Sequence, residues 1–320
     1  MKSFLAGFGK SVLLTGLVSV LAISAFAQLS LRDAIDSNND NKADFMIFRP
    51  ANNRWYILNS AGGIREQEFG VANTDFMVPG DYDGDGFGDI AVWRETDGNW
   101  YRINSATSTF TVNTWGVSGD EPVARDYDGD GKTDLAVVRR SNGVMTWYFF
   151  YVGTNGIESR QFGVPTDFTA PGDYNGDLKF DLAVQRPGAT LTSPATFYIQ
   201  TANSFETIVF GQSSDLVVPG DWDGDGKTDV AVVREGATPT SNLTWFVRKS
   251  SNGQILQRPW GVSGTDLNVQ NDYDGDGKTD FAVWRNTDGK FYVYNEVTAG
   301  ISVVSWGAPN DFPIGSYDTH

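Results

Sequence analysis

The chain contains no cysteine, and its one histidine, His320, is the last of its 320 residues. These absences exclude a disulfide framework, Cys–His and Ser–His–Asp nucleophile systems and histidine-rich zinc sites. Basic residues are also few, because 24 Lys and Arg stand against 40 Asp and Glu and leave a formal charge of −16. So acidic a chain is repelled by nucleic acid and by anionic membrane surfaces, and we expect neither as a partner.

Residues 1–27 have the features of a secretory signal peptide. Lys2 and Lys10 make a basic start, a mostly apolar stretch follows, and a small-x-small motif precedes Gln28. The apolar stretch is short for a spanning helix, which argues against a membrane anchor. We expect a mature chain of residues 28–320 without a membrane span, located as a secreted, periplasmic or cell-surface protein.

A nine-residue acidic motif recurs along the mature chain. Its clearest copy runs from Asp81 to Asp89 and carries Asp at positions 1, 3, 5 and 9 and Gly at position 6. Oxygen ligands at alternating positions of a tight turn suit a hard cation such as calcium, and the glycine lets the chain double back. The copies start at Asp36, Asp81, Asp126, Asp173, Asp221 and Asp272.

The charge of the chain follows from these motifs. Of the 24 residues at positions 1, 3, 5 and 9, 22 are Asp and two are Asn. Cleavage of the signal would remove two lysines and take the formal charge from −16 to −18. Six divalent ions would bring it to about −6. The acidity therefore indicates metal sites and requires no cationic partner.

The residues between motifs predict strands. In the second repeat these are Phe76–Pro79, Ile90–Arg94, Trp100–Asn104 and Phe110–Gly116. They show alternating apolar and polar residues, are rich in β-branched and aromatic side chains, and are separated by turns that contain Gly, Asn and Asp. Four strands in each of six repeats predict an all-β fold, a β-propeller of six four-stranded blades in one domain. The C-terminal segment from Asp311 to Tyr317 would add a strand to the first blade and close the ring. The alternative of seven blades would need three more strands.

Three further features recur once per repeat. An arginine five residues after the last loop Asp either faces a ligand or anchors a loop or neighbouring blade, and we favour the anchor because a ligand rarely needs six copies. An aromatic pair on the third strand either packs between blades or stacks on sugars, and we favour packing. The arginines are Arg49, Arg94, Arg139, Arg186, Arg234 and Arg285. The pairs are Trp55-Tyr56, Trp100-Tyr101, Trp147-Tyr148, Phe197-Tyr198, Trp245-Phe246 and Phe291-Tyr292. An aspartate stands six residues before five of the loops: Asp75, Asp120, Asp167, Asp215 and Asp266.

Two insertions interrupt this regularity, at Pro187 to Pro194 and at Glu235 to Asn242. Each lies between a second and a third strand and is rich in Gly, Pro, Ser and Thr, which is typical of surface loops. Because the repeats differ there, these loops are candidates for a partner-specific face.

The repeated D-x-D-x-D-G-x-x-D motif, with Pro79-Gly80 or Pro219-Gly220 before it and Ile90-Ala91-Val92 after it, resembles FG-GAP/VCBS-type repeats. The resemblance covers nearly the whole mature chain. It implies a propeller, as in integrin α-subunits, with up to six calcium ions bound by positions 1, 3, 5 and 9 and by the backbone carbonyl of position 7. The implied ligand residues are Asp36, Asn38, Asp40, Lys42 and Asp44; Asp81, Asp83, Asp85, Phe87 and Asp89; Asp126, Asp128, Asp130, Lys132 and Asp134; Asp173, Asn175, Asp177, Lys179 and Asp181; Asp221, Asp223, Asp225, Lys227 and Asp229; and Asp272, Asp274, Asp276, Lys278 and Asp280.

Two of these loops depart from the pattern. The first has Asn38 and Asn41, and the fourth has Asn175 and places Leu178 where glycine is expected. A left-handed turn costs a non-glycine residue about 1 kcal/mol. We therefore expect the first and fourth loops to be the weakest calcium sites. An EF-hand is excluded, because position 12 of loops 2 to 6 is a valine in an apolar strand instead of a carboxylate.

Three functions fit these features. The first is a secreted, monomeric, calcium-stabilised scaffold for interaction or adhesion, with an extracellular protein or glycan as partner. The second is a carbohydrate-binding lectin that uses exposed aromatic residues. The third is a polysaccharide lyase or hydrolase on the same fold. We favour a non-enzyme, because an active site is one asymmetric constellation whereas the informative residues here repeat six times.

Overall fold

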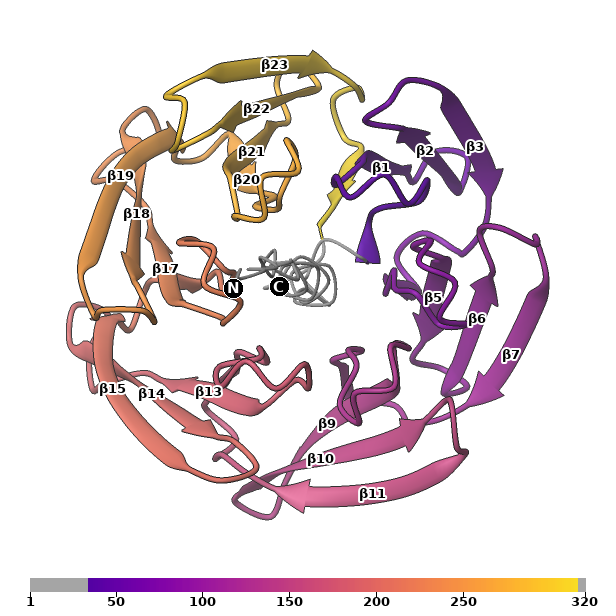
Figure 1. The fold of residues 1–320 in the computed structure, drawn as a ribbon, viewed down its shortest axis with the longest axis horizontal. Coiled ribbons are helices and arrows are strands. Elements are labelled where there is room, and N and C mark those ends of the chain that lie inside the picture. The colour runs from indigo at the N-terminus through magenta and orange to yellow at the C-terminus, as the bar shows by residue number, and fades with distance from the viewer. Residues whose placement is uncertain (1–33, 316–320) are drawn as a thin grey trace, which may run out of the picture.

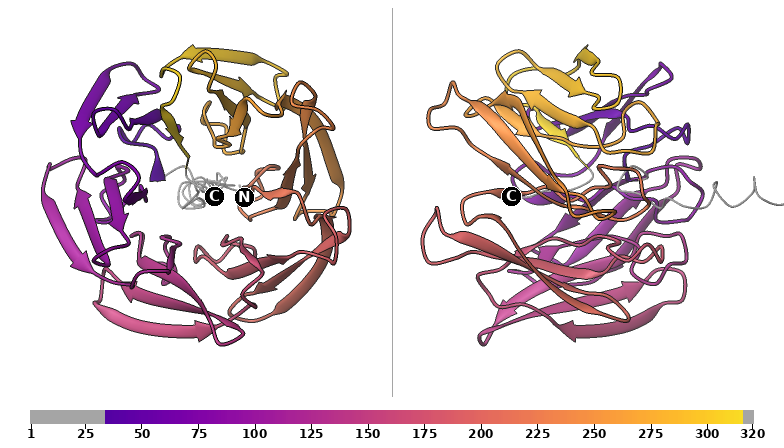
Figure 2. Two further views of the ribbon diagram at one scale, coloured as in Figure 1. Left: turned by 180° about the vertical axis from the view of Figure 1, so that it is seen from behind. Right: turned by 60° about the vertical axis from the view of Figure 1, so that its left-hand side comes forward.

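The computed structural model describes residues 34–315, and the expected signal peptide lies outside this range. Six four-stranded antiparallel sheets stand in a ring about a common axis (Figure 1 and Figure 2). This confirms the predicted six-bladed β-propeller. In the part of the chain that is described, no helix is both long and apolar enough to cross a bilayer.

Each blade runs from an inner first strand to an outer fourth strand (Figure 1). Blade 1 comprises β24 (Phe312–Ile314), β1 (Phe45–Arg49), β2 (Arg54–Leu58) and β3 (Ile64–Glu68). Blade 2 comprises β4 (Asp75–Met77), β5 (Ile90–Arg94), β6 (Asn99–Ile103) and β7 (Phe110–Thr114). Blade 3 comprises β8 (Glu121–Pro122), β9 (Leu135–Ser141), β10 (Val144–Tyr151) and β11 (Gly156–Gln161).

The remaining blades repeat this order. Blade 4 comprises β12 (Phe168–Thr169), β13 (Leu182–Arg186), β14 (Pro194–Gln200) and β15 (Phe205–Gln212). Blade 5 comprises β16 (Leu216–Val217), β17 (Val230–Arg234), β18 (Asn242–Arg248) and β19 (Ile255–Val262). Blade 6 comprises β20 (Asp266–Asn268), β21 (Phe281–Arg285), β22 (Lys290–Tyr294) and β23 (Ile301–Ser305).

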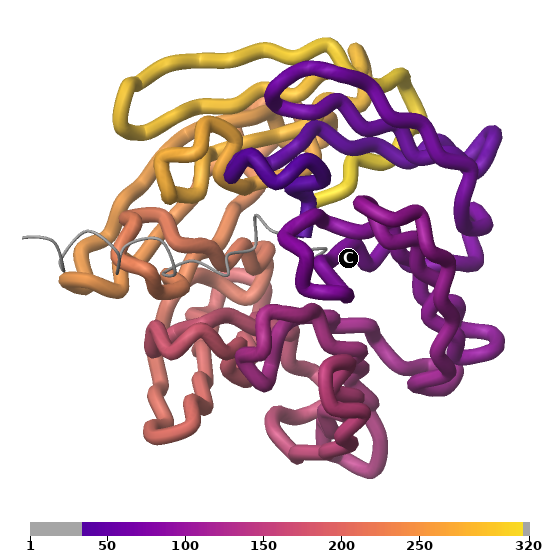
Figure 3. The backbone as a smooth tube through the Cα atoms, turned by 45° about the vertical axis from the view of Figure 1, so that its right-hand side comes forward, coloured from indigo at the N-terminus to yellow at the C-terminus, as the bar shows by residue number. Residues whose placement is uncertain are grey.

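The ring closes where the C-terminal strand joins the first blade, as predicted. β24 pairs antiparallel with β1, with Met46 opposite Ile314 and Phe48 opposite Phe312. The yellow C-terminal segment accordingly lies beside the indigo start of the described chain (Figure 3). The pairing gives blade 1 its first strand and covers an edge of β1 that would otherwise expose backbone N–H and C=O groups.

The recurring arginine anchors the chain between blades. In blade 2, Arg94 donates through Nε and Nη2 to both oxygens of Asp75, at 2.7 and 2.8 Å, and lies 4.7 Å from the ring centre of Tyr101. Asp75 also accepts the backbone N–H of Val71 at 2.8 Å, in the turn that arrives from blade 1. The structural interpretation of this arginine is therefore confirmed. In blade 1 the aspartate that pairs with Arg49 is Asp311, so the same unit also fastens the closure.

The aromatic pairs pack between blades. The first member of each pair is fully buried: Trp55, Trp100, Trp147, Phe197, Trp245 and Phe291. In blade 5, Trp245 packs with Phe281 of blade 6, while Phe246 on the same strand packs with the cluster that includes Phe210 of blade 4. The core is thus a series of layers between neighbouring sheets, and the buried rings are not available to stack on a sugar.

We predict that Ile314→Ala lowers the free energy of unfolding by about 3 kcal/mol, because Ile314 is 3% exposed in the closing strand and its truncation leaves a cavity. Phe312→Ala on the same strand is the matched control, since Phe312 is 53% exposed and its loss should cost less. Urea unfolding measures both. If both variants lost the same free energy of unfolding, burial of Ile314 would not be what stabilises the closing strand.

Candidate metal centre

The aspartate loops are numbered 1 to 6 from Asp36 onward. Loops 2 to 6 connect the first and second strands of their blades, and loop 1 leads into β1, the second strand of blade 1. In loop 2 the carboxylate of Asp81, at position 1, accepts backbone N–H groups from Gly84, Asp85 and Gly86 at 2.7, 3.2 and 2.8 Å. Gly86 has φ +86°, a left-handed conformation that permits the reversal at position 6. The loop therefore winds around the position 1 side chain.

Position 9 ties each loop to the sheet behind it. Asp89 accepts the backbone N–H of Tyr82 at 3.0 Å and that of Ser105 at 2.7 Å, the latter from the turn after β6. Its own backbone forms an isolated antiparallel bridge with Gly80. The equivalent bridges are Arg125 with Asp134, Gly172 with Asp181, Gly220 with Asp229 and Asn271 with Asp280.

Four loops bring three carboxylates together. Within each set, one oxygen atom per residue lies within 4.8 Å of the others. The sets are Asp81, Asp83 and Asp85; Asp126, Asp128 and Asp134; Asp221, Asp223 and Asp225; and Asp272, Asp274 and Asp276. Carboxylates this close repel one another unless a proton or a cation lies between them.

Two buried carboxylate oxygens have no hydrogen-bond donor in the described part of the chain, which favours a bound cation in these loops. The Oδ1 atoms of Asp83 and Asp223, both at position 3, are buried and have no hydrogen-bond partner among residues 34–315. A buried carboxylate oxygen without a partner is costly, and a divalent ion would satisfy it. The donor set consists of carboxylate oxygens, which calcium and magnesium prefer, and lacks the sulfur and imidazole ligands that zinc favours. The residues present therefore fit calcium.

Burial raises the pKa values of the loop carboxyls. The pKa of the position 9 carboxyl is raised to about 7 in loops 2 to 6, chiefly because burial removes water from the charged form. The pKa values of Asp126 and Asp221 at position 1 are raised to about 6 for the same reason. Neighbouring carboxylates of the same loop add to the rise. Without a cation, these carboxyls keep their protons to a higher pH than a free carboxyl does, and the position 9 carboxyls do so to a higher pH than Asp126 and Asp221.

Loops 1 and 4 differ from the other four loops because each has an asparagine at position 3. In loop 4, Nδ2 of Asn175 donates to Asp177 at 3.1 Å and to Asp181 at 3.3 Å. In loop 1, Nδ2 of Asn38 donates to Asp40 at 3.0 Å. The amide thus partly replaces the charge of a cation, and neither loop contributes a set of three clustered carboxylates among the described residues. Position 6 is left-handed in both, with φ +65° at Asn41 and +66° at Leu178.

The six loops are joined to one another, which the sequence analysis did not predict. The backbone N–H at position 8 of each loop donates to the position 1 carbonyl of the loop before it. In loops 2 and 3, for example, Thr133 donates to Asp81 at 2.6 Å. The other bonds run from Gly88 to Asp36, Phe180 to Asp126, Thr228 to Asp173, Thr279 to Asp221, and Ala43 to Asp272. The last of these closes the circle, on the inner side of the blades (Figure 1).

Position 7 has a side-chain role beyond the carbonyl that the resemblance implies. Lys132 of loop 3 lies against Gly84 of loop 2, and a Cβ on that glycine would be 3.1 Å from Cγ of the lysine. The same contact joins Lys179 to Gly129, Lys227 to Gly176, Lys278 to Gly224 and Lys42 to Gly275. Each lysine therefore covers the preceding loop, and its positive charge offsets part of that loop's negative charge. Phe87, at position 7 of loop 2, places no lysine over loop 1.

The turns after the third strands also serve the loops. Asn104 donates to Asp83 at 2.5 Å, Ser251 donates to Asp223 at 2.5 Å, and Asn295 donates to Asp274 at 2.5 Å. These donors were missed by sequence reasoning. A signal existed, because a polar Asn or Ser follows the third strand in blades 1, 2, 5 and 6.

We predict that the metal-free protein loses stability as pH rises. A carboxyl whose pKa is about 7 when folded and 3.8 when unfolded favours folding below pH 3.8, and this contribution disappears as pH rises through 7. Thermal melts of calcium-free protein between pH 5 and 8 should therefore show a falling midpoint. Asp89→Asn should flatten the profile, since it removes one of these groups. A midpoint that rises between pH 5 and 7 would contradict the electrostatics described for the loops.

The chain is similar to known proteins in the sequence of one repeat and in its overall fold. Residues 81–137 match the sequence model of the FG-GAP-like repeat, a stretch that begins at position 1 of loop 2 and extends into β9. No curated protein matches the chain. Among solved structures, AofleA from Arthrobotrys oligospora is similar with a TM-score of 0.52 and 11% identity, over 88% of this chain and 90% of that one.

A second similar structure is the oligogalacturonate lyase from Vibrio parahaemolyticus, with a TM-score of 0.48 and 11% identity, over 87% of this chain and 81% of that one. At such identities the likeness to AofleA extends to the fold alone. The chain is a six-bladed β-propeller in which residues 81–137 match an FG-GAP-like repeat.

Proposed function

We propose that the chain is a secreted calcium-binding β-propeller that acts as an extracellular interaction or adhesion scaffold. The observation that carries the proposal is the buried, unpartnered position 3 oxygen of Asp83 and Asp223, each within a set of three clustered carboxylates. Calcium would supply the positive charge that these oxygens lack. The position 1, 3, 5 and 9 carboxylates would hold it, and the backbone bonds between loops would hold those carboxylates in place.

The scaffold role is supported by the way the other charged groups are used. Several glutamates outside the loops are paired with arginines at the surface, for example Glu66 with Arg54 and Glu296 with Arg258. The six repeated arginines are paired with aspartates between blades. A rigid ring whose repeated arginines are all paired between blades is suited to present its variable connections to a partner. Location outside the cytoplasm rests on the signal-like residues 1–27.

We predict that calcium removal lowers the melting temperature at pH 7.5. An ion bound only by the folded state stabilises it by about 2.7 kcal/mol per site when its free concentration is a hundred times the dissociation constant. Thermal unfolding in excess calcium and after exhaustive chelation measures the difference, and magnesium serves as the comparison ion. Identical melting temperatures in calcium and chelator would contradict calcium binding.

A matched pair of variants assigns this effect to the loops. Asp225→Ala removes a member of a clustered set, whereas Asn175→Ala alters a loop that its own amide already stabilises. We expect Asp225→Ala to lose more of the calcium-dependent stabilisation than Asn175→Ala. Equal losses would contradict the ranking of the sites.

A further inference from the structure

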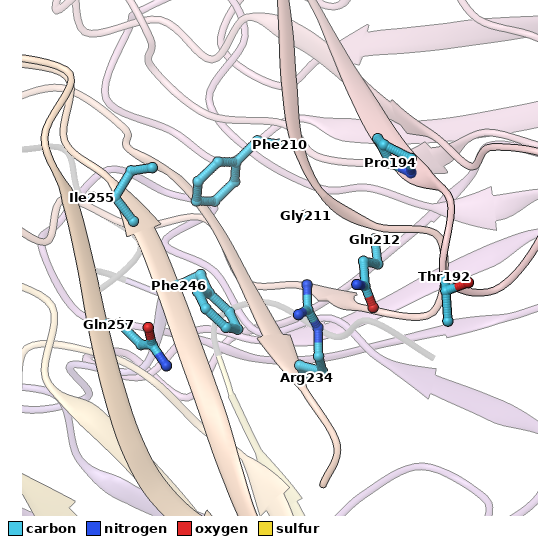
Figure 4. Close-up of a pocket in the computed structure, with 9 residues that line it drawn as sticks. All are labelled: Thr192, Pro194, Phe210, Gly211, Gln212, Arg234, Phe246, Ile255 and Gln257. Atoms are coloured by element: carbon cyan, nitrogen blue, oxygen red, sulfur yellow. The ribbon is translucent and has the colours of Figure 1, made fainter. Parts of the chain in front are cut away.

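One cleft lies between blades 4 and 5, away from the aspartate loops. It has a volume of about 400 Å³, within the size range of small-ligand sites. Blade 4 and the connection before β14 contribute one wall, and strands β17, β18 and β19 of blade 5 contribute the other (Figure 4). The lining residues are Thr192, Pro194, Phe210, Gly211, Gln212, Arg234, Phe246, Ile255 and Gln257.

The cleft exists because two positions that carry large aromatic side chains at other blade interfaces carry smaller side chains at this one. At three interfaces the fourth strand ends in a tryptophan whose Nε1 donates to a third-strand carbonyl of the next blade: Trp115 to Tyr148, Trp260 to Tyr292 and Trp306 to Tyr56. At two others a phenylalanine replaces it, but a second phenylalanine from the next blade packs against it: Phe69 with Phe110 and Phe162 with Phe205. Between blades 4 and 5 the corresponding residues are Phe210 and Ile255. The first position therefore has phenylalanine instead of tryptophan, and the second has isoleucine instead of phenylalanine.

The wall from blade 4 is held in place by its own hydrogen bonds. The backbone of Ser213 donates to the carbonyl of Ser193 at 3.0 Å, and that of Ser214 donates to Leu191 at 3.0 Å. Oγ of Ser213 accepts the backbone N–H of Gly188 at 2.7 Å. The insertion at Pro187 to Pro194, which the sequence singled out as a candidate partner face, is thereby fastened to the turn that enters blade 5. The cleft is pre-formed.

The cleft combines an apolar end with a neutral polar end. Phe210, Phe246 and Ile255 group at one end, and Arg234, Gln212 and Thr192 lie at the other (Figure 4). Arg234 donates through Nε and Nη2 to Asp215 at 2.7 and 2.8 Å, so its charge is already neutralised and Nη1 lies outside that pair. Ile255 is 64% exposed, which places an apolar side chain at the open edge. A second anion would gain little from the paired arginine, whereas a neutral oxygen can accept from Nη1.

We propose that this cleft binds a neutral saccharide. A sugar ring has apolar C–H faces that pack on the exposed side chain of Ile255 and on the parts of Phe210 and Phe246 that line the cleft, and hydroxyl groups that both donate and accept hydrogen bonds. The amides of Gln212 and Gln257 and the hydroxyl of Thr192 offer the same two functions. About 400 Å³ is room for a short neutral glycan. This gives the scaffold a glycan ligand at one interface, and it does not require calcium in the loops.

The cleft is a binding site and not a hydrolytic one. None of the nine lining residues is Asp, Glu, His or Tyr, so the lining contains no pair of carboxyl groups for glycoside hydrolysis and no general base. The arginine beside it cannot be deprotonated. A glycan held there would be released unchanged.

The test compares the wild-type chain with a variant that fills the cleft. Phe210→Trp introduces the residue found at the equivalent place in blades 2, 5 and 6, with an expected bond to the Phe246 carbonyl. Binding is measured on an array of neutral and sialylated glycans, and then by titration with the best neutral oligosaccharide. We expect the wild type to bind neutral glycans, and Phe210→Trp and Gln257→Ala to weaken that binding at least tenfold.

Gln254→Ala is the matched control, since Gln254 is exposed just before β19 but does not line the cleft. It should bind as the wild type does, and all variants should keep the wild-type melting temperature within a few degrees. No neutral-glycan binding by the wild type, preference for sialylated glycans, or undiminished binding by Phe210→Trp would each overturn the proposal. Calcium uptake, measured on the same samples, reports separately on the scaffold proposal.

Discussion

The structure depends on one set of backbone hydrogen bonds, those from the position 8 N–H of each aspartate loop to the position 1 carbonyl of the preceding loop. They bring six acidic loops into one closed circle, where like charges would push the blades apart. The lysine at position 7 reduces this repulsion at five of the six contacts. Among the described residues, the Oδ1 atoms at position 3 of loops 2 and 5 are buried carboxylate oxygens without a partner, and a cation there would compensate their charge.

Away from the loops, the blades are held together without any covalent cross-link. The Arg–Asp pair fixes each turn between blades, and buried aromatic side chains fill the layers between sheets. In blade 1 the pair is completed by Asp311, which comes from the other end of the chain. Closure thus uses the same contacts as every other interface, and this explains why three residues of β24 suffice to complete the first sheet.

Much of this arrangement could be predicted from the sequence because the period is regular. The repeated motif led to six blades, the terminal segment led to the closure, and Asn38 and Asn175 marked the two loops without a three-carboxylate set. Contacts between repeats could not be predicted, because no spacing along the chain shows that Lys132 covers Gly84. The cleft was hidden for a similar reason, since it follows from the sizes of Phe210 and Ile255 on different blades. Gln185, which is fully buried with both amide atoms unpartnered among the described residues, has no explanation in either the sequence or the contacts.

The central claim is that the clustered loop carboxylates are metal ligands. Native mass spectrometry of the folded chain after dialysis against calcium tests it directly, because it counts the ions held per molecule. The account predicts at least four bound calcium ions, one for each set of three clustered carboxylates, with weaker occupancy of loops 1 and 4. A folded chain that holds no calcium at millimolar supply would contradict it.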